Sequence, residues 1–354
     1  MAQTIRNSRP RRPTAVDLFA GCGGLTVGLK RAGFTVLGAV EINRLAADTY
    51  RTNHPSVAFW RRDIRKLSAE RILRRLQLRP GQLDLLAGCP PCQGYSTIRT
   101  RNRRTPVEDH RNDLIFEFLR LVNGLRPRAI MLENVPGLQH DERFGRFCDG
   151  LRRLGYRIYH RVLDAAEFGV PQRRRRLILL ACRRHLVLPA SPAPVRESVR
   201  SAIDGLPAPG ESGDPVHDVY EKRSERIQQL IEDIPVDGGS RIDLGEQRQL
   251  ACHKRLDGFK DVYGRMAWDE VAPTITSGFV NPSKGRFLHP EQNRTITPRE
   301  AALLQTFPAD YHFPIEAGKF PVAEMIGNAL PPEFIRRHAV GIAEMIRRRP
   351  TRRV

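Results

Sequence analysis

Short apolar runs alternate with amphipathic stretches over the first 132 residues of the chain. A brief apolar run bounded by turn residues is typical of a buried strand, and apolar residues spaced three or four apart are typical of a helix. We therefore expect strands at 16–19, 35–40, 57–60, 83–87 and 129–132, and helices at 24–31, 43–51, 69–76 and 114–125. This alternation indicates βαβ units, a parallel sheet and ligand binding beyond the carboxyl ends of the strands.

The pattern changes after the apolar run 177–182, which we expect to be one more buried strand. Prolines and glycines crowd residues 189–215, and the chain to 289 mixes one helical segment, 225–231, with strand-like pieces such as 273–277. Helical spacing returns at 298–305 and 332–346. The predicted division is a flexible basic arm (1–12), a first domain (13–182), a smaller mixed domain (183–289), a segment that returns to the first domain (290–346) and a basic tail (347–354).

Composition and charge indicate a globular protein with a polyanionic partner. The 354 residues are 40% hydrophobic and 28% charged, and their net charge is +20. Nucleic acid is the first candidate partner, although a GC-rich genome would also enrich Arg without any function. No apolar run approaches the roughly 20 residues of a membrane span, and residues 1–15 lack the apolar stretch of a signal peptide. We expect an intracellular, cytoplasmic protein with free thiols.

The charge is unevenly spread along the chain. Acidic and basic residues nearly balance within 183–289, so the positive excess comes from the rest of the sequence. We therefore expect the non-specific grip on a polyanion to come from outside this domain.

A glycine turn and a later carboxylate indicate a nucleoside site. Gly21-Cys-Gly-Gly24 lies between a predicted strand and helix, and Glu41 ends the next strand. A carboxylate at this spacing can accept both ribose hydroxyls of an adenosine. Thr26 stands where a dinucleotide fingerprint has its third glycine, and a tight strand–helix junction remains an alternative for the turn. Asp63, after the third strand, is a candidate for the adenine amino group or simply a helix cap.

The segment Gly88-Cys-Pro-Pro-Cys-Gln-Gly-Tyr-Ser96 follows the fourth predicted strand. Two prolines stiffen the approach to Cys92, which fixes the direction of its sulfur. A Cys-x-x-Cys pair also suits redox chemistry or zinc. No second Cys or His pair stands at ligand spacing, so we expect no metal.

Six blocks of sequence, taken in order, carry a family resemblance. They are Asp17-Leu-Phe-Ala-Gly-Cys-Gly-Gly24, Pro91-Cys-Gln93, Glu133-Asn-Val135, Gln172-Arg-Arg-Arg-Arg176, Thr297-Pro-Arg-Glu300 with Leu304-Gln-Thr-Phe-Pro308, and Gly327-Asn-Ala-Leu-Pro331. From about residue 15 to about residue 345 the chain resembles the cytosine-5 DNA methyltransferases of the bacterial and phage modification type.

The resemblance implies an α/β fold: a Rossmann-like S-adenosylmethionine-dependent methyltransferase sheet with helices on both faces, plus a smaller mixed target-recognition domain at 183–289. It implies methyl transfer to carbon 5 of a cytosine flipped out of duplex DNA. Cys92 would add to carbon 6, Glu133 would bind ring nitrogen 3 and the exocyclic amine, and Arg174 and Arg176 would serve the cytosine carbonyl and the local electrostatics. Arg173 and Arg175 should face the other way, since side chains alternate along a strand.

The resemblance also implies two sets of binding residues. Those for S-adenosylmethionine are Phe19, Gly21, Gly23, Glu41, Asp63, Pro91 and Asn328. Those for DNA are Arg99, Arg101, Arg103 and Arg104 in the loop after Cys92, and Trp268, Thr274 and Thr276 in the recognition domain. Without the resemblance, Phe19 could be plain core and each loop arginine a solvated side chain.

Three other functions compete with this hypothesis. An RNA cytosine methyltransferase would share Pro-Pro-Cys-Gln and Glu-Asn-Val, but its late Cys-Phe-Thr element is missing here. A catalytically inactive DNA-binding homologue would have no need of Cys92 and Glu133, and a nicotinamide oxidoreductase leaves Cys92 unexplained. The expected partner is duplex DNA, bound by a monomer, with room for a restriction endonuclease that acts separately.

Overall fold

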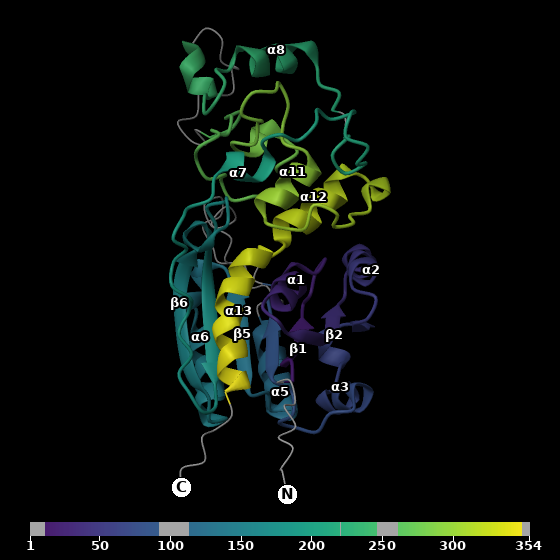
Figure 1. Cartoon of the computed structure of the whole chain (residues 1–354), viewed down its shortest axis with the longest axis vertical. Helices are drawn as coiled ribbons and strands as arrows, with labels where there is room; N and C mark the ends of the chain where they lie inside the picture. Colours follow the sequence, from purple (N-terminus) through teal and green to yellow (C-terminus); the bar gives the residue numbers. More distant parts are fainter. Residues whose placement is uncertain (1–10, 92–112, 220, 246–260, 349–354) are drawn as a thin grey trace, which may run out of the picture.

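The computed structural model describes residues 11–91, 113–219, 221–245 and 261–348. Its centre is a seven-stranded sheet in the order β3-β2-β1-β4-β5-β7-β6 (Figure 1). The strands are β1 (Thr14–Leu18), β2 (Thr35–Glu41), β3 (Ala58–Arg61), β4 (Leu85–Gly88), β5 (Ala129–Asn134), β6 (Arg157–Asp164) and β7 (Arg175–Cys182). The predicted alternation is confirmed for β1 to β5, which run parallel.

The parallel arrangement predicted from the first five strands does not extend to β7, which runs antiparallel to both β5 and β6. A parallel neighbour needs a crossover of a dozen or more residues, usually a helix. Only the short 3-10 turn Ala165–Phe168 and a few further residues join β6 to β7. The chain therefore doubles back, and β7 begins at the edge where the parallel strands end.

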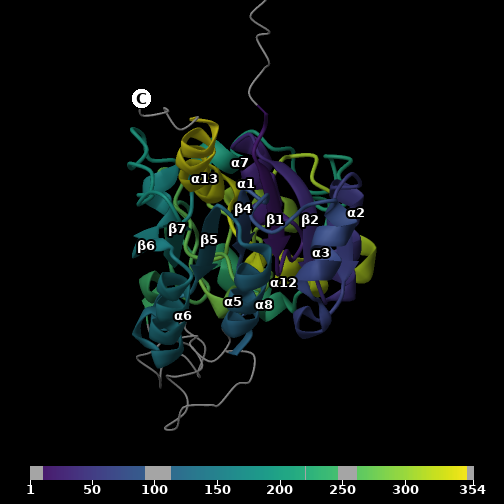
Figure 2. The same cartoon turned by 90° about the horizontal axis from the view of Figure 1, so that it is seen from below.

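Helices cover both faces of the sheet, as Figure 2 shows from below. The helices α1 (Gly24–Arg31) and α13 (Pro332–Arg347) pack together on one face, beside Tyr50 of α2 (Arg44–Asn53). The other face carries α3 (Ala69–Leu76), α5 (Leu114–Leu125) and α6 (Glu142–Arg153). The sheet is thus buried on both sides, which explains why its strands read as nearly continuous apolar runs.

A lobe built largely from irregular segments lies beyond one edge of the sheet. Its helices among the described residues are α7 (Val199–Ile203), α8 (Glu225–Asp233), α11 (Pro298–Leu304) and α12 (Lys319–Asn328) (Figure 1). In the described part of this lobe, strand-like pairing is confined to isolated bridges. The predicted strand at 273–277 is wrong: Pro273 lacks an N–H group, and the Ile275 N–H donates to the Gln172 side chain rather than to a strand.

One sequence block from the family resemblance turns out to be a helix cap. The Thr297 hydroxyl accepts from the Glu300 N–H at 3.2 Å, and the Glu300 carboxylate accepts from the Thr297 N–H at 2.7 Å. Pro298 occupies the first turn, where its missing N–H costs nothing. This reciprocal pair starts α11, and a guanidinium–carboxylate pair from Arg294 holds Glu300 in place.

Residues 298–328 share their hydrophobic core mainly with other lobe segments, and α13 then carries the chain back to the sheet. The domain boundaries drawn from the sequence stay a prediction.

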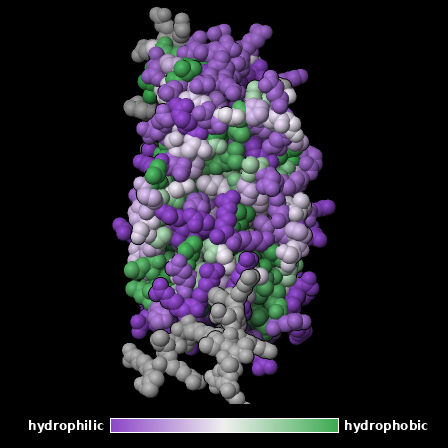
Figure 3. Space-filling model, viewed as in Figure 1, coloured by the Kyte–Doolittle hydropathy of each residue, from purple (hydrophilic) through white to green (hydrophobic). Residues whose placement is uncertain are grey.

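Figure 3 shows hydrophilic side chains over most of one face, with smaller hydrophobic areas between them. None of the described helices is long and apolar enough to cross a membrane.

Candidate active site

The functional candidates meet at one edge of the sheet. The strands β1, β2, β4 and β5 end there, the antiparallel β7 begins there, and the lobe faces this edge (Figure 1). Ligands of open α/β sheets bind at such an edge, between strands whose connections leave to opposite faces. This geometry brings Glu41, Glu133 and Arg176 to the same edge of the sheet.

Two glycines of the turn after β1, Gly21 and Gly23, have different roles. Gly21 has a φ of +55°, and a side chain there would meet nothing within 4 Å. Gly23 has a φ of +108° and precedes α1, and a Cβ there would lie 2.5 Å from the Tyr311 hydroxyl and 2.8 Å from His54 Nε2. Packing therefore requires glycine at Gly23, whereas the turn at Gly21 borders open space that a ligand can enter.

Glu41 fixes this turn to the end of β2. Its Oε2 accepts from the Gly21 N–H at 2.9 Å, and its Oε1 accepts from the N–H groups of Ile42 and Asn43 at 2.9 and 2.8 Å. Ile42 is 63% exposed beside this carboxylate and offers an apolar surface to a flat ring. Ile42 is not among the residues expected from the sequence; its signal is a large apolar residue between a strand-ending acid and a helix-capping Asn.

The remaining cofactor candidates make no contact with the glycine turn that the structure records. Asp63 accepts from the Arg65 N–H at 3.0 Å as the cap of a short 3-10 helix, and the Arg65 guanidinium lowers its pKa through a side-chain hydrogen bond. The helix-cap alternative for Asp63 is therefore the arrangement found here. Phe19, with a φ of 60°, and Pro91 are half-buried, and Asn328 is exposed at the end of α12.

Glu133 lies at the end of β5 and is 1% exposed. Its Oε1 is 2.9 Å from Nε of Arg176, and its Oε2 accepts from the Cys89 thiol at 2.7 Å. Next to it, the Asn134 amide donates to the Pro90 carbonyl at 2.9 Å, which holds the chain leading to Cys92 beside Glu133. Burial, and then the charge of Glu133, raise the pKa of Cys89 well above its usual value, so Cys89 is a neutral thiol.

The two inward-facing arginines of Gln172-Arg-Arg-Arg-Arg176, Arg174 and Arg176, make different contacts. Arg174 is 3% exposed and donates to the carbonyls of Ile275, at 3.0 Å, and Gly327, at 3.2 Å. Burial, and then the charge of Arg176, lower the pKa of Arg174 to about 9, so it stays charged at neutral pH. Arg174 thus joins the sheet to two lobe segments, whereas Arg176 faces Glu133.

The predicted alternation of this arginine run is confirmed. Arg173 and Arg175 are exposed, while Arg174 is buried and the Arg176 side chain is 15% exposed. The backbone alone sets this pattern, because successive side chains of an extended segment point to opposite sides.

Gly327 explains why the late Gly-Asn block begins with glycine. A Cβ at this position would overlap the backbone of Thr276 and Ser277. This close approach lets the Gly327 carbonyl reach Arg174. The sequence alone did not indicate this contact, since Arg174 and Gly327 are far apart along the chain.

The predicted DNA-contacting residues have mixed outcomes. The nucleophile candidate Cys92 and the loop arginines Arg99, Arg101, Arg103 and Arg104 lie outside the described residues. Thr274 donates to the Arg173 carbonyl at 2.7 Å, Thr276 accepts from the Gly278 N–H at 3.4 Å, and neither is fully buried.

The assignment of Trp268 to DNA contacts needs correction. Its ring is 6% exposed, its indole N–H donates to Glu291 at 2.8 Å, and the Arg200 guanidinium stacks on it at 5.3 Å. A tryptophan with its polar atom satisfied and its ring inside the lobe core stabilises the lobe and leaves little surface for contact with DNA.

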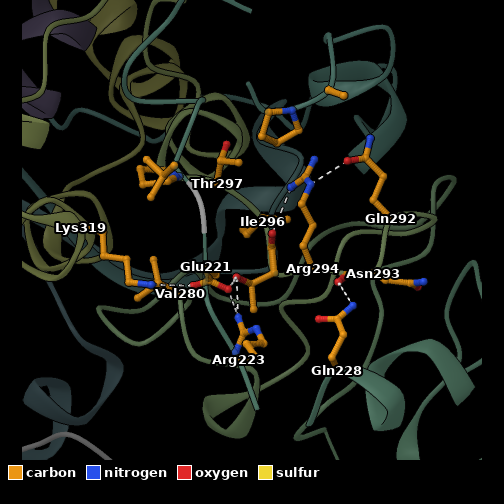
Figure 4. Close-up of a pocket in the computed structure, with 15 residues that line it drawn as sticks. Glu221, Arg223, Gln228, Val280, Gln292, Asn293, Arg294, Ile296, Thr297 and Lys319 are labelled. Carbon is orange, nitrogen blue, oxygen red and sulfur yellow. Dashed lines mark hydrogen bonds and ion pairs between the residues drawn. The ribbon is translucent and has the colours of Figure 1, made fainter. Parts of the chain in front are cut away.

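A pocket of about 330 Å³ lies in the lobe, apart from these groups (Figure 4). Glu221 there pairs with Arg223 and with Lys319, and Arg294 pairs with Glu300. Each of these charged side chains is held in an ion pair, so the pocket adds no reactive group to the site.

Comparison with known proteins identifies the family. A model of the C-5 cytosine-specific DNA methylase family matches residues 14–344. The chain belongs to this family. It is a DNA (cytosine-5-)-methyltransferase, which agrees with a strand-edge glycine turn and a buried glutamate–arginine pair in one site.

Similar proteins include two named as type II enzymes. The chain is 38% identical to the type II methylase M.HgiDII of Herpetosiphon aurantiacus, over 89% of this chain and 91% of that protein. It is 32% identical to the type II methyltransferase M.XorII of Xanthomonas oryzae, over 96% of this chain and 86% of that protein.

Solved structures share the fold. A DNA modification methyltransferase encoded within an E. coli prophage has a TM-score of 0.69 and 25% identity, covering 95% of this chain and 100% of that one. The DNMT2 structure from Spodoptera frugiperda has a TM-score of 0.62 at 18% identity, over 94% of this chain and 98% of that one, and shows a likeness of fold alone. The expected sheet with helices on both faces and an added lobe is thereby confirmed.

Proposed function

We propose that this methyltransferase uses S-adenosylmethionine and acts on a cytosine flipped out of duplex DNA, with Cys92 as the nucleophile. The observation that carries the proposal is the Glu133–Arg176 pair, 2.9 Å apart and nearly closed to water, beside the segment that leads to Cys92. A carboxylate and a guanidinium so placed can bind opposite sides of a pyrimidine edge.

The residues at the cofactor end suit an adenosine. Open space borders Gly21, the Glu41 carboxylate stands where ribose hydroxyls need an acceptor, and the exposed Ile42 can cover one face of adenine. Phe19, Gly23, Pro91 and Asn328 complete the proposed cofactor residues, and Asp63 would have to exchange its Arg65 contact to reach the adenine amine. When bound, S-adenosylmethionine supplies an electrophilic methyl group to carbon 5.

The choice of nucleophile between the two cysteines of the Cys-x-x-Cys pair favours Cys92. Cys89 keeps its proton and donates a hydrogen bond to Glu133, so it is a poor source of thiolate. Cys92 would form a bond from its sulfur to carbon 6, pushing the ring π electrons towards carbon 5. Carbon 5 would then gain the methyl group, and the S–CH3 bond of the sulfonium would break to leave a neutral thioether. Loss of the carbon 5 proton to water and release of the Cys92 sulfur would restore the aromatic ring.

Glu133 and Arg176 would hold the base during this addition. Glu133 can accept from the exocyclic amine and share a proton with ring nitrogen 3, where negative charge develops as the sulfur adds. Arg176 can donate to the carbonyl at carbon 2. Arg174 acts as a positioning residue, because its donors are already committed to Ile275 and Gly327.

Contacts to DNA would come from the loop arginines Arg99, Arg101, Arg103 and Arg104, with Thr274 and Thr276 at the lobe edge. Arginines suit phosphate contacts that hold the duplex beside an extruded base. Because the relatives named above are type II enzymes, we also propose a DNA-modification role beside a separate restriction endonuclease.

A covalent trap tests the nucleophile. A duplex that carries 5-fluorocytosine should form a stable adduct in the presence of S-adenosylmethionine, because fluorine cannot leave as a proton does. Peptide mapping should find the adduct on Cys92, Cys92→Ala should abolish it and Cys89→Ala should keep it. An adduct on Cys89 would overturn the assignment, and transfer to tRNA in preference to duplex DNA would overturn the substrate.

A further inference from the structure

A second cavity opens at the end of the molecule opposite the active site. Its volume is about 900 Å³, and it lies between the end of β7 and the last turns of α13. Arg175 starts β7 at the active-site edge and Cys182 ends it in the cavity wall. At about 3.4 Å per residue, this strand separates the two sites by roughly 24 Å.

Most of the charged side chains that line the cavity are basic. Arg128, Arg183, Arg184, His185 and Arg348 face a single acidic side chain, Glu344. Arg128 is 3.1 Å from buried Asp84, which also pairs with Arg11, so those three groups together still leave a positive charge. Within the described residues, no carboxylate pairs with Arg183, Arg184 or Arg348.

Arg348 is the C-cap of α13, but no helix terminus accounts for Arg183 or Arg184. Basic side chains often neutralise the carbonyl end of a helix, as Arg126 does for α5. Arg183 and Arg184 follow a strand, so no helix dipole is available to them. Arg183 is held instead by Tyr156, whose ring lies 5.5 Å from its guanidinium carbon and whose hydroxyl accepts from its Nε at 3.4 Å.

We propose that this cavity and its arginine rim, Arg183, Arg184 and Arg348, bind the phosphate backbone of duplex DNA away from the target cytosine. An open cavity with several separate guanidinium groups fits a chain of phosphates better than a single anion. The substrate of this enzyme is itself such a polymer. The surface raises the affinity for non-specific DNA and makes no contact with the reacting base.

The salt dependence of DNA binding tests the proposal. Binding of a non-specific fluorescent duplex is measured from about 50 to about 300 mM salt for the full chain, for Arg183→Gln/Arg184→Gln/Arg348→Gln and for Arg184→Gln/Arg348→Gln. The slope of log affinity against log salt should become shallower by about 0.9 for each phosphate that the variant no longer neutralises. The double variant keeps the Arg183–Tyr156 contact, so it answers the question even if the triple variant folds poorly.

Arg74→Gln/Arg75→Gln is the matched control. It removes two exposed charges from the last turn of α3, on the other face of the sheet. The control should keep the wild-type slope, and both cavity variants should keep the wild-type kcat on saturating plasmid DNA. An unchanged slope in the cavity variants, or an equal change in the control, would overturn the proposal. If poly-glutamate displaced the fluorescent duplex as strongly as unlabelled duplex does at equal charge, the surface would be assigned to an acidic protein instead.

Discussion

Glu133 illustrates how one residue can be prepared for catalysis by its neighbours. Its carboxylate meets the Arg176 guanidinium and the Cys89 thiol in a site nearly closed to water. A low local dielectric strengthens any contact made there with a developing charge.

Glu133→Gln should therefore lower kcat by about 10²- to 10³-fold. Its dissociation constant for S-adenosylmethionine, measured by calorimetry, should stay at the wild-type value. Glu142→Gln, on the exposed first turn of α6, is the control and should keep full activity. A Glu133→Gln enzyme with a near wild-type rate would remove Glu133 from the mechanism.

Asp17 is the second residue with an unusual environment. It is fully buried, accepts from the Thr26 hydroxyl at 2.7 Å, and has one oxygen without a partner among the described residues. Burial raises its pKa from 3.8 to about 7. The unfolded chain therefore loses this proton at lower pH than the folded protein, and the contribution of Asp17 to stability falls as the pH rises from about 4 to about 7.

Asp17→Asn should remove this dependence. Relative to the wild type, the variant should gain stability between about pH 4 and about pH 7, by at most about 4 kcal/mol, and the difference should level off at higher pH. Denaturant unfolding across this pH range measures it. Asp84→Asn is the control: it leaves Arg11 and Arg128 without their shared carboxylate, and it should destabilise the protein. A constant difference for Asp17→Asn would contradict the expected titration.

At the scale of elements, the start of α1 is tied to the lobe. The Tyr311 hydroxyl donates to the Cys22 carbonyl at 2.5 Å and lies 3.2 Å from His54 Nε2, at the end of α2. His54 in turn lies 3.1 Å from the Lys30 ammonium, and burial lowers its pKa to about 4, so it is neutral in the working range. These contacts fix the turn at Gly23, whereas the space beside Gly21 stays open.

Tyr311→Phe should consequently weaken S-adenosylmethionine binding several-fold while changing kcat little, because the turn loses a hydrogen bond and the reacting groups do not. Calorimetric titration with the cofactor is the measurement. Tyr156→Phe removes a similar buried hydroxyl, which donates to the Pro127 carbonyl at 2.6 Å at the far end of the sheet. Equal decreases in affinity in the two variants would show a general effect on stability.

At the scale of the whole molecule, the lobe and the sheet share a core. One hydrophobic cluster contains Cys22 and Val27 from the start of α1 together with Phe307 and Met325 from the lobe. Arg174 adds polar links between the same parts. The two parts therefore have no independent interior at their junction, and unfolding one exposes the apolar surface of the other.

Differential scanning calorimetry of the full chain should accordingly show one cooperative transition, with a calorimetric enthalpy equal to the van't Hoff enthalpy. Arg174→Met should lower its midpoint without splitting it. Two resolved transitions in the wild type would show that the lobe unfolds on its own.

At this scale, part of the positive charge can also be assigned to one region of the molecule. The net charge of +20 suggested a polyanionic partner. Three arginines without an ion pair among the described residues, Arg183, Arg184 and Arg348, follow the ends of β7 and α13 and line the cavity opposite the active site. Several other arginines neutralise helix ends or buried carboxylates, so the net charge by itself overstates the surface available to DNA.

The amino-acid sequence by itself determined the alternation of strands and helices along the first domain and the family. These features are local: apolar spacing, Asn43 and Thr297 as caps, and short motifs depend on residues that are neighbours along the chain. Even the alternation of Arg173 to Arg176 follows from the geometry of an extended backbone.

Only the tertiary structure decided the direction of β7, the burial of Trp268, the thiol state of Cys89 and the separate roles of Arg174 and Arg176. Each of these depends on contacts between residues that are distant in the sequence. Arg174 and Arg176 have the same side chain two positions apart, and only the carbonyls of Ile275 and Gly327 on one side and the carboxylate of Glu133 on the other distinguish them. Such partners are brought together by the packing of the lobe on the sheet, which no local pattern encodes.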